Sequence, residues 1–188
     1  MNESEQPALA PRHMGAVNWL GLWTLYAKEV RRFLNVHLQT IGAPVVTSLL
    51  FLAVFLLALG RAVEMVNGIP FATFLAPGLI MMTMVQNAFA NSSSSITIAK
   101  VQGNIVDVLM PPLSAGEMVA GFAFGAVTRG MIVGLVTAIF MSFFVDVAIH
   151  NIWAILYFGI SASLMLSLLG IAGGVWAAKF DHIAVVTN

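Results

Sequence analysis

The sequence contains no cysteine and few charged residues. The absence of cysteine excludes disulfide bonds, thiolate catalysis, and zinc or iron–sulfur sites with cysteine ligands. Charged residues make up 9% of the 188 residues and hydrophobic residues 60%, whereas a soluble domain carries about 25% charged residues. Eight basic and eight acidic side chains cannot cover a water-soluble globule of this size. We therefore expect lipid to surround most of this protein.

The sequence also lacks motifs for catalysis and for nucleic acid binding. Its formal net charge is zero, so we expect no nucleic acid partner. There is no His-Glu-x-x-His run, nucleophile elbow or phosphate-binding glycine loop. The four histidines share no metal-ligand spacing: His13, His37, His150 and His182. We expect no catalytic residue, no cofactor and no metal site in this chain, although a membrane enzyme stays an alternative.

Four stretches are long and apolar enough to cross a bilayer, which takes about 20 residues. They are residues 38–59, 71–91, 119–145 and 153–177, and Arg129 is their only charged residue. Another apolar run begins at Ile183 and predicts the start of a fifth helix. The fold class is therefore predicted as an all-α integral membrane protein, a polytopic helical bundle with four complete spanning helices.

The N-terminal region is predicted to lie outside the bilayer. Residues 1–17 are mostly polar and lack the basic-then-apolar order of a signal peptide, so we expect a disordered tail. In residues 18–34, apolar and aromatic side chains recur at three- and four-residue steps around four charged residues. This pattern predicts an amphipathic helix at the membrane interface. A plain extension of the first span would also fit.

Basic residues outside the spans predict the orientation of the chain. Only Arg61 falls on the side opposite the N-terminus. The others share the N-terminal side in an even hairpin pattern: Arg12, Lys28, Arg31, Arg32, Lys100 and Lys179. This asymmetry predicts a cytoplasmic N-terminus.

The segment between the second and third spans is predicted to be an ordered platform on the cytoplasmic side. Residues 97–110 predict a helix, and Pro111-Pro112 ends it. Ser114-Ala-Gly-Glu117 then predicts a capping box that starts the third span. An ordinary interfacial loop helix is the alternative. Apolar residues on one face of this helix, with polar residues beside them, form the candidate surface: Lys100, Val101, Asn104, Ile105, Asp107 and Val108.

A polar stripe runs along the second span. Lipid offers such groups no partner, so the stripe must face protein or a water-filled cavity. Hydrogen bonding between helices and the lining of a transport path both explain it. Ser94 extends the stripe. The candidates for lining a path are four residues of the stripe together with the arginine of the third span: Thr83, Gln86, Asn87, Asn91 and Arg129.

Arg129 is the charge inside the third span. A charge at a helix centre costs about 2.5–3.5 kcal/mol on insertion scales. Arg129 lies nearer the predicted cytoplasmic end, so its long side chain can reach the headgroups. A structural ion pair and contact with a substrate headgroup are the other interpretations.

Small residues predict where the helices pack closely. Gly121-x-x-x-Gly125 and Gly130-x-x-x-Gly134 lie on roughly opposite faces of the third span, so we expect two neighbouring helices there. The fourth span carries a continuous stripe of small residues: Gly159, Ser163, Ser167, Gly170 and Gly174. We assign these residues to packing and not to chemistry.

Several of these segments in this order resemble the permease subunit of ABC-2 type transporters. They are the interfacial basic-aromatic helix, Phe74 to Met82 with its Pro-Gly pair, Asn87 to Ser94, and Leu109-Met-Pro-Pro-Leu-Ser114. The family has six spans, so the resemblance implies that residues 18–188 form a transmembrane domain incomplete at its C-terminal end. It also implies that residues 97–110 are a coupling helix for an ATPase, flanked by the N-terminal helix.

The resemblance predicts an ABC exporter permease in a bacterial inner membrane that moves a drug, lipid or polysaccharide. Its implied partners are an ABC ATPase subunit that binds the ATP, a second permease copy and membrane lipid. A non-transporting scaffold or assembly subunit is an alternative of another class. An ion-coupled secondary transporter is a further alternative, although paired intramembrane carboxylates, typical of proton relays, are absent from the sequence.

Overall fold

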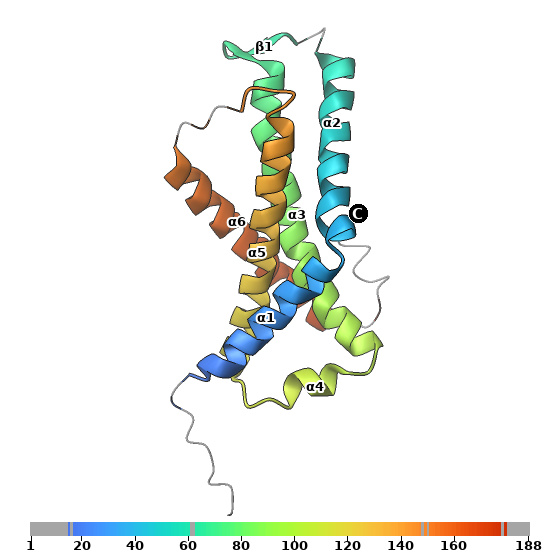
Figure 1. Ribbon diagram of the computed structural model, residues 1–188, viewed down its shortest axis with the longest axis vertical. Coiled ribbons are helices and arrows are strands. Elements are labelled where there is room, and N and C mark those ends of the chain that lie inside the picture. Colours follow the sequence, from blue (N-terminus) through green and yellow to red (C-terminus); the bar gives the residue numbers. More distant parts are fainter. Residues whose placement is uncertain are drawn as a thin grey trace, which may run out of the picture.

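The computed structural model describes residues 15, 17–60, 63–147, 149, 151–177 and 179. These residues are almost wholly helical (Figure 1). The elements are α1 (Trp19–Asn35), the π-helix η1 (Leu38–Gly42), α2 (Ala43–Leu59), β1 (Met65–Val66), β2 (Ile69–Pro70), α3 (Phe71–Val101), α4 (Ile105–Leu109), α5 (Ala115–Met141) and α6 (Ile152–Trp176). The predicted tail up to Met14 and the predicted fifth helix from Ile183 lie outside the described residues, as do Arg61, His13, His150 and His182.

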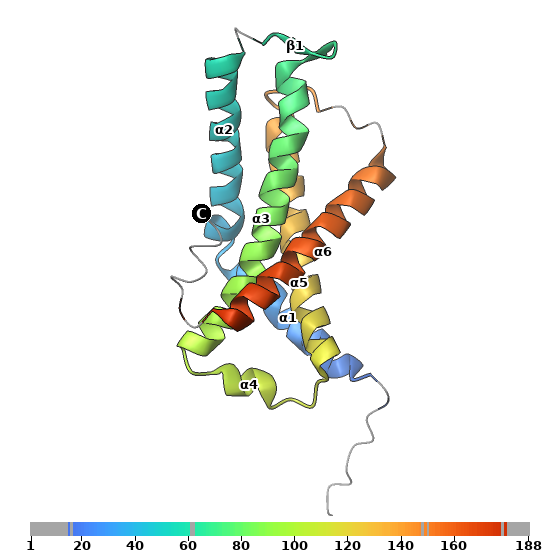
Figure 2. The same ribbon diagram turned by 180° about the vertical axis from the view of Figure 1, so that it is seen from behind.

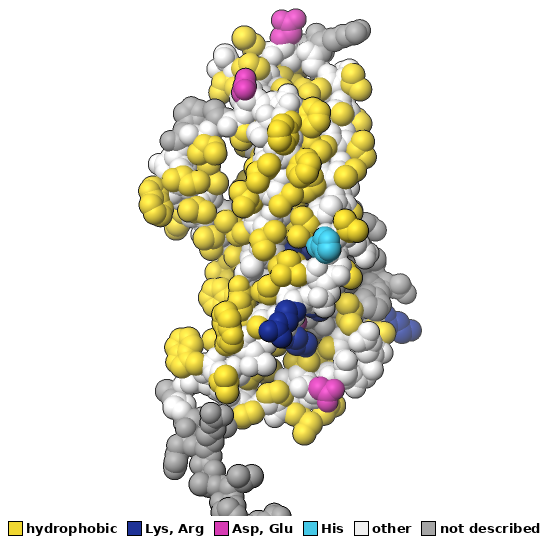
Figure 3. Space-filling model, viewed as in Figure 1, with side chains coloured by type: hydrophobic (Ala, Val, Ile, Leu, Met, Phe, Trp, Pro, Cys, Tyr) yellow, Lys and Arg dark blue, Asp and Glu magenta, His cyan; other side chains and the backbone are white. Residues whose placement is uncertain are grey.

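Four helical segments are long and apolar enough to span a membrane, which confirms the prediction of an all-α polytopic bundle. They are Leu38–Leu59, Phe71–Val101, Ala115–Met141 and Ile152–Trp176. Large hydrophobic side chains are exposed along all four, among them Leu57, Phe74, Leu135 and Phe158. Hydrophobic groups also dominate the face drawn in Figure 3. Such a surface is stable in lipid and not in water.

The helix α3 is the centre of the bundle. It packs against α2, α5 and α6, and α6 crosses it obliquely in both views (Figure 1, Figure 2). The short β1–β2 hairpin precedes α3 and turns at Asn67 and Gly68, which both have positive φ. This hairpin lies at one end of the bundle and α4 at the other (Figure 1). The two ends of the bundle therefore differ in structure.

The predicted helix over residues 97–110 is wrong. Residues 97–101 continue α3, and only Ile105–Leu109 form the separate helix α4. The break has a local cause, because Gly103 adopts a φ of +76°, a conformation that glycine takes without a Cβ clash. Its amide nitrogen donates to the Lys100 carbonyl at 3.1 Å, which closes the end of α3. The second span is thus longer than predicted.

The helix α1 is confirmed by the structure. The side chain of Asn18 caps its start and accepts from the amide of Gly21 at 3.0 Å. Val36 interrupts the helix before η1, and α1 runs obliquely to α2 (Figure 1). It is therefore no straight extension of the first span. It packs on α5 and buries Leu25, Glu29 and Phe33.

The two glycine pairs on α5 each pack closely against a neighbouring helix, as predicted, and we call these two contact points the glycine seats. A Cβ at Gly121 would lie 2.7 Å from the Leu25 side chain, so this face receives α1. A Cβ at Gly130 would lie 2.8 Å from the carbonyl oxygen of Met84, and the side chain of Met84 also fills the space above Gly134. The second face therefore receives α3.

The small-residue stripe on α6 packs closely, as predicted, and its partner is α3. A Cβ at Gly174 would lie 3.0 Å from the Ser93 carbonyl oxygen, and Gly170 lies against Phe89 and Ser92. The Ser92 hydroxyl also donates to the Ser167 carbonyl at 2.9 Å. Small side chains therefore let the two helices come close enough for a side-chain hydroxyl of α3 to donate to a backbone carbonyl of α6.

Candidate functional site

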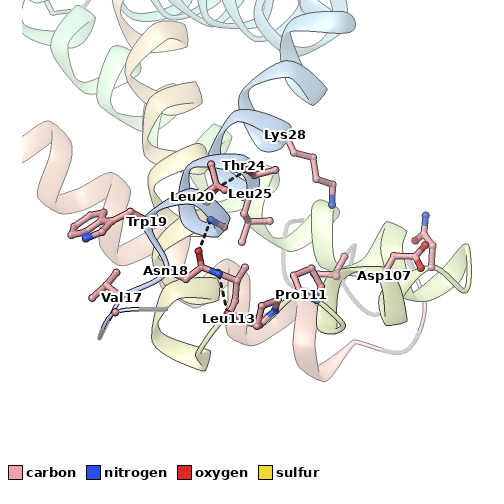
Figure 4. Close-up of a pocket in the computed structure, with 15 residues that line it drawn as sticks. Val17, Asn18, Trp19, Leu20, Thr24, Leu25, Lys28, Asp107, Pro111 and Leu113 are labelled. Carbon is pink, nitrogen blue, oxygen red and sulfur yellow. Dashed lines mark hydrogen bonds between the residues drawn. The ribbon is translucent and has the colours of Figure 1, made fainter. Parts of the chain in front are cut away.

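Most of the candidate functional residues predicted from the sequence lie at two sites. The first is a groove at the α4 end of the bundle, between the start of α1 and the segment from α4 to Leu113. Its volume is about 920 Å³, and Lys28 and Asp107 line it together with the Pro111-Pro112 pair (Figure 4). Most side chains of α4 are exposed, and none is buried.

Glu117 joins the elements that border this groove. Its Oε2 accepts from the Ser114 amide at 2.6 Å, and the Ser114 hydroxyl accepts from the Glu117 amide, which confirms the predicted capping box. Its Oε1 accepts from the amide of Asn18 at 2.5 Å. The Asn18 side chain in turn donates to the Pro112 carbonyl at 3.1 Å. The start of α1, the Pro-Pro loop and the start of α5 are thus hydrogen-bonded as one unit.

The six residues of the predicted coupling surface do not stay together. Lys100 lies near the end of α3, and its Nζ donates to the carbonyls of Gly174, Val175 and Ala177 at the end of α6. Val101 is exposed at the last position of α3, and Asn104 precedes α4. Ile105, Asp107 and Val108 lie on α4 itself. The predicted ATPase contact of all six stays a prediction.

The second site is where the polar stripe of α3 meets its neighbours. The stripe makes hydrogen bonds to three helices: Thr83 with Ser48 of α2, Asn87 with Arg129 of α5, and Asn91 with Arg32 of α1. Three residues of the stripe therefore form hydrogen bonds between helices, and the lining of a path stays a prediction. Gln86 is exposed.

Glu29 and Arg32 of α1 form a partly buried ion pair against α3. Glu29 is fully buried, and its Oε1 accepts from the Ser95 hydroxyl at 2.7 Å. Its Oε2 accepts from Nε and Nη2 of Arg32 at 3.2 and 3.0 Å. The missing side chain of Gly125 gives Glu29 its space, since a Cβ there would lie 2.7 Å from the Glu29 Cβ. Glu29 therefore helps to hold α1 in the bundle.

The sequence reasoning missed this role, because it counted Glu29 among the charges of the amphipathic helix. A signal was present. Glu29 lies four residues after Leu25 and four before Phe33, which places it on the apolar face of α1.

Arg129 is held inside the bundle. Its Nη2 donates to Oδ1 of Asn87 at 2.9 Å, and within the described parts of the chain its Nε has no hydrogen-bond partner. No ion pair to Arg129 is found among these residues either, so the interpretation as a structural ion pair finds no support there. We call Glu29, Arg32, Asn87, Asn91 and Arg129 the arginine cluster.

A hollow of about 300 Å³ lies between α2 and α3 beside this cluster. Its polar lining consists of Gln39, Thr47, Ser48, Thr83, Gln86 and Asn87. Three candidates for lining a path, Thr83, Gln86 and Asn87, therefore share one cavity. Asn91 and Arg129 do not line it, but Asn87 belongs to both the hollow and the arginine cluster.

The described residues contain no group of three or more histidines and carboxylates that could hold a metal ion. The expected absence of catalytic, cofactor and metal sites stays a prediction.

Comparison with known proteins gives one consistent result. The model of the ABC-2 type transporter family matches residues 21–188. The chain is 34% identical over 168 residues to the inner membrane transport permease YadH of Escherichia coli strain K12, and proteins of this name from Escherichia coli O157:H7 and Shigella flexneri match equally. The alignment covers 89% of this chain and 66% of each relative, so the chain spans about two thirds of their length.

No significant match was found among solved structures. The four spanning helices, the extent of the family match and the identity to these permeases agree with one another. The chain belongs to the ABC-2 type transporter family.

Proposed function

We propose that this chain is the membrane-spanning permease subunit of an ATP-driven exporter in a bacterial inner membrane. An ABC ATPase subunit would bind and hydrolyse the ATP, and a second permease copy would complete the pathway. The substrate would be an amphipathic or polymeric molecule, such as a drug, a lipid or a polysaccharide. Family membership and the names of the permease relatives support this proposal.

The observation that carries the proposal is the exposed surface of α4. Val106, Leu109 and Met110 have exposed fractions of 57%, 59% and 75%. Val106 and Leu109 lie on α4 and Met110 is its C-cap, at the end of the bundle opposite the β1–β2 hairpin (Figure 1). Exposed apolar side chains beside a charged residue such as Asp107 are typical of a protein-binding surface. We assign this surface to the ATPase and this end of the bundle to the cytoplasm.

A movement of α4 can be transmitted to the rest of the bundle through the polypeptide chain and through hydrogen bonds. The chain from α4 continues through Pro112, whose carbonyl accepts from Asn18 of α1, to the Glu117 cap of α5. α1 is in turn tied to α3 through Glu29 and Arg32. A movement of the docking surface would thus shift α1 and α5 together. Binding of ATP can then favour one arrangement of the helices over another.

The test is purification of the tagged full chain from its own host, followed by measurement of the ATP hydrolysis that the purified complex carries. We expect Val106→Glu and Leu109→Glu to reduce the hydrolysis per permease at least tenfold, because each places a charge in an apolar contact. The control is Met65→Glu in β1, which is also exposed but lies at the other end. Full ATPase association in both α4 variants would refute the docking surface. Transport that needs an ion gradient and no ATP would refute the exporter.

A further inference from the structure

The arginine cluster contains more positive than negative charge. Glu29 is its only carboxylate, and both oxygens of Glu29 already accept hydrogen bonds from Ser95 and Arg32. The positive charges of Arg129 and Arg32 repel each other. The cluster therefore holds two guanidinium groups and one carboxylate, and Arg129 has no ion-pair partner in the part of the chain that the structure describes.

The cluster also contains hydrogen-bond donors without acceptors. Nε of Arg129 and Nδ2 of Asn91 are buried and have no partner among the described residues. Asn91 is fully buried, and its Oδ1 is already used by Arg32. Buried polar groups are almost always paired, and an unpaired charged donor is the most unfavourable kind. An additional group that supplies both acceptors and negative charge would satisfy the cluster.

We infer that the arginine cluster binds the phosphate or carboxylate group of an anionic amphiphile, with Arg129 as its principal ligand. Guanidinium groups favour these oxyanions because charge-assisted hydrogen bonds to them are short and strong. A water molecule would accept one hydrogen bond but would leave the excess charge uncompensated. As a statement about the transported substrate, this inference rests on the proposed function. As a statement about a binding site, it does not.

The hollow between α2 and α3 provides space for the rest of the headgroup. Asn87 lines the hollow and also holds Arg129, so the two are adjacent. The other polar lining residues are neutral hydroxyl and amide groups, which fit hydroxyl groups of a ligand. A volume of about 300 Å³ is at the lower limit for small-molecule pockets. The hollow would therefore hold a headgroup and not a whole lipid.

Exposed apolar side chains continue from this hollow along α2. Phe51 lines the hollow and is exposed, and Leu50 and Val54 are exposed nearby on the same helix. An acyl chain can lie along this surface while the headgroup remains in the hollow. The juxtaposition of an apolar helix face, neutral polar groups and an arginine with a buried Nε matches an amphiphile with a negative headgroup.

The experiment uses the full chain in nanodiscs of phosphatidylcholine and measures binding by calorimetry. The probes are dihexanoyl phosphatidic acid and inorganic phosphate, and the control ligand is dihexanoylglycerol, which lacks the phosphate. We expect dihexanoyl phosphatidic acid to bind at least tenfold more tightly than dihexanoylglycerol. Arg129→Gln should weaken this binding at least tenfold. The matched control is Arg31→Gln, an exposed arginine beside Arg32, which should leave it unchanged.

A second variant separates lost binding from lost folding. Asn91→Asp adds a carboxylate to the cluster beside Arg32, so the cluster would then hold two carboxylates for its two guanidinium groups. We expect this variant to lose binding of dihexanoyl phosphatidic acid at least tenfold and to keep or raise its melting temperature. Retained binding in Asn91→Asp would overturn the inference, as would binding that does not depend on Arg129.

The two probes distinguish the source of the anion. Binding of inorganic phosphate that requires Arg129 would show that the phosphate group alone is recognised, whereas binding of the short-chain lipid alone would show that the acyl chains contribute. Absence of both would overturn the inference. ATPase association is measured separately, on the α4 variants. A negative result there would refute the proposed function and leave the anion site standing. A negative result in the binding experiment would refute the anion site and leave the proposed function standing.

Discussion

Replacing Glu29 with alanine should loosen α1 from the bundle. The carboxylate is fully buried and accepts three hydrogen bonds, one from Ser95 and two from Arg32. Removing one partner of a buried ion pair typically costs about 3–5 kcal/mol. Arg32 has a 28% exposed side chain and keeps its bonds to Asn91, which moderates the penalty. We therefore expect the free energy of unfolding to fall by about 3 kcal/mol, at the lower end of that range.

The measurement is unfolding by sodium dodecyl sulfate in mixed micelles, followed by tryptophan fluorescence. Trp19 and Trp23 lie on α1, so they report its release from α5. Glu29→Gln keeps the volume and an acceptor for Ser95 but loses the charge, and it should cost less than Glu29→Ala. The control Arg31→Gln changes an exposed charge on the same helix and should stay within about 0.5 kcal/mol of the wild type.

A double-mutant cycle tests whether the ion pair itself carries the effect. The variants Glu29→Gln and Arg32→Gln are measured singly and together. For residues in direct contact, we expect a coupling free energy of about 1 kcal/mol. Our account would be refuted by Glu29→Ala costing less than about 1 kcal/mol together with additive effects in the cycle.

Two further predictions concern the contacts between helices. In the same unfolding assay, Gly125→Ala should cost about 1–3 kcal/mol, because its Cβ would lie 2.7 Å from the Glu29 Cβ, whereas Gly116→Ala meets nothing within 4 Å and should be neutral or stabilising. Equal effects at the two glycines would contradict close packing of α1 on α5. Lys100→Met should speed hydrogen exchange at the end of α6, because the cation that satisfies three of its carbonyls is lost. Lys179→Met, an exposed cation, should not, and unchanged exchange in Lys100→Met would refute this role.

The spans, the capping box and the glycine seats could be predicted because each depends on residues close in sequence. A spanning helix needs only a long apolar run, and the first span was predicted with the observed bounds, Leu38–Leu59. Ser114 and Glu117 make their reciprocal bonds within one turn. Gly121 and Gly125 share a face because they are four residues apart. None of these inferences requires knowledge of the partner helix.

The roles of Glu29, Lys100 and Arg129 depend on partners far along the chain. Lys100 contacts carbonyls more than 70 residues away, and Arg129 contacts Asn87 on another helix. A cation near a helix end is normally assigned to solvent or headgroups, so the sequence favoured those interpretations. The end of α3 is a different case. Gly103 marked the break locally, but the periodic apolar residues on both sides suggested one continuous helix.

The π-helix at the start of the first span has a mechanical consequence. A π turn holds an extra residue compared with an α turn, so conversion of η1 to an α-helix would rotate all of α2 by about 100°. The Thr40 hydroxyl supports the present form by donating to the carbonyls of Phe33 and Val36. Such a rotation would carry Ser48 away from Thr83, and it would close or reshape the hollow that the two residues line. Conversion of this one π turn to an α turn is therefore enough to change which side of α2 faces α3.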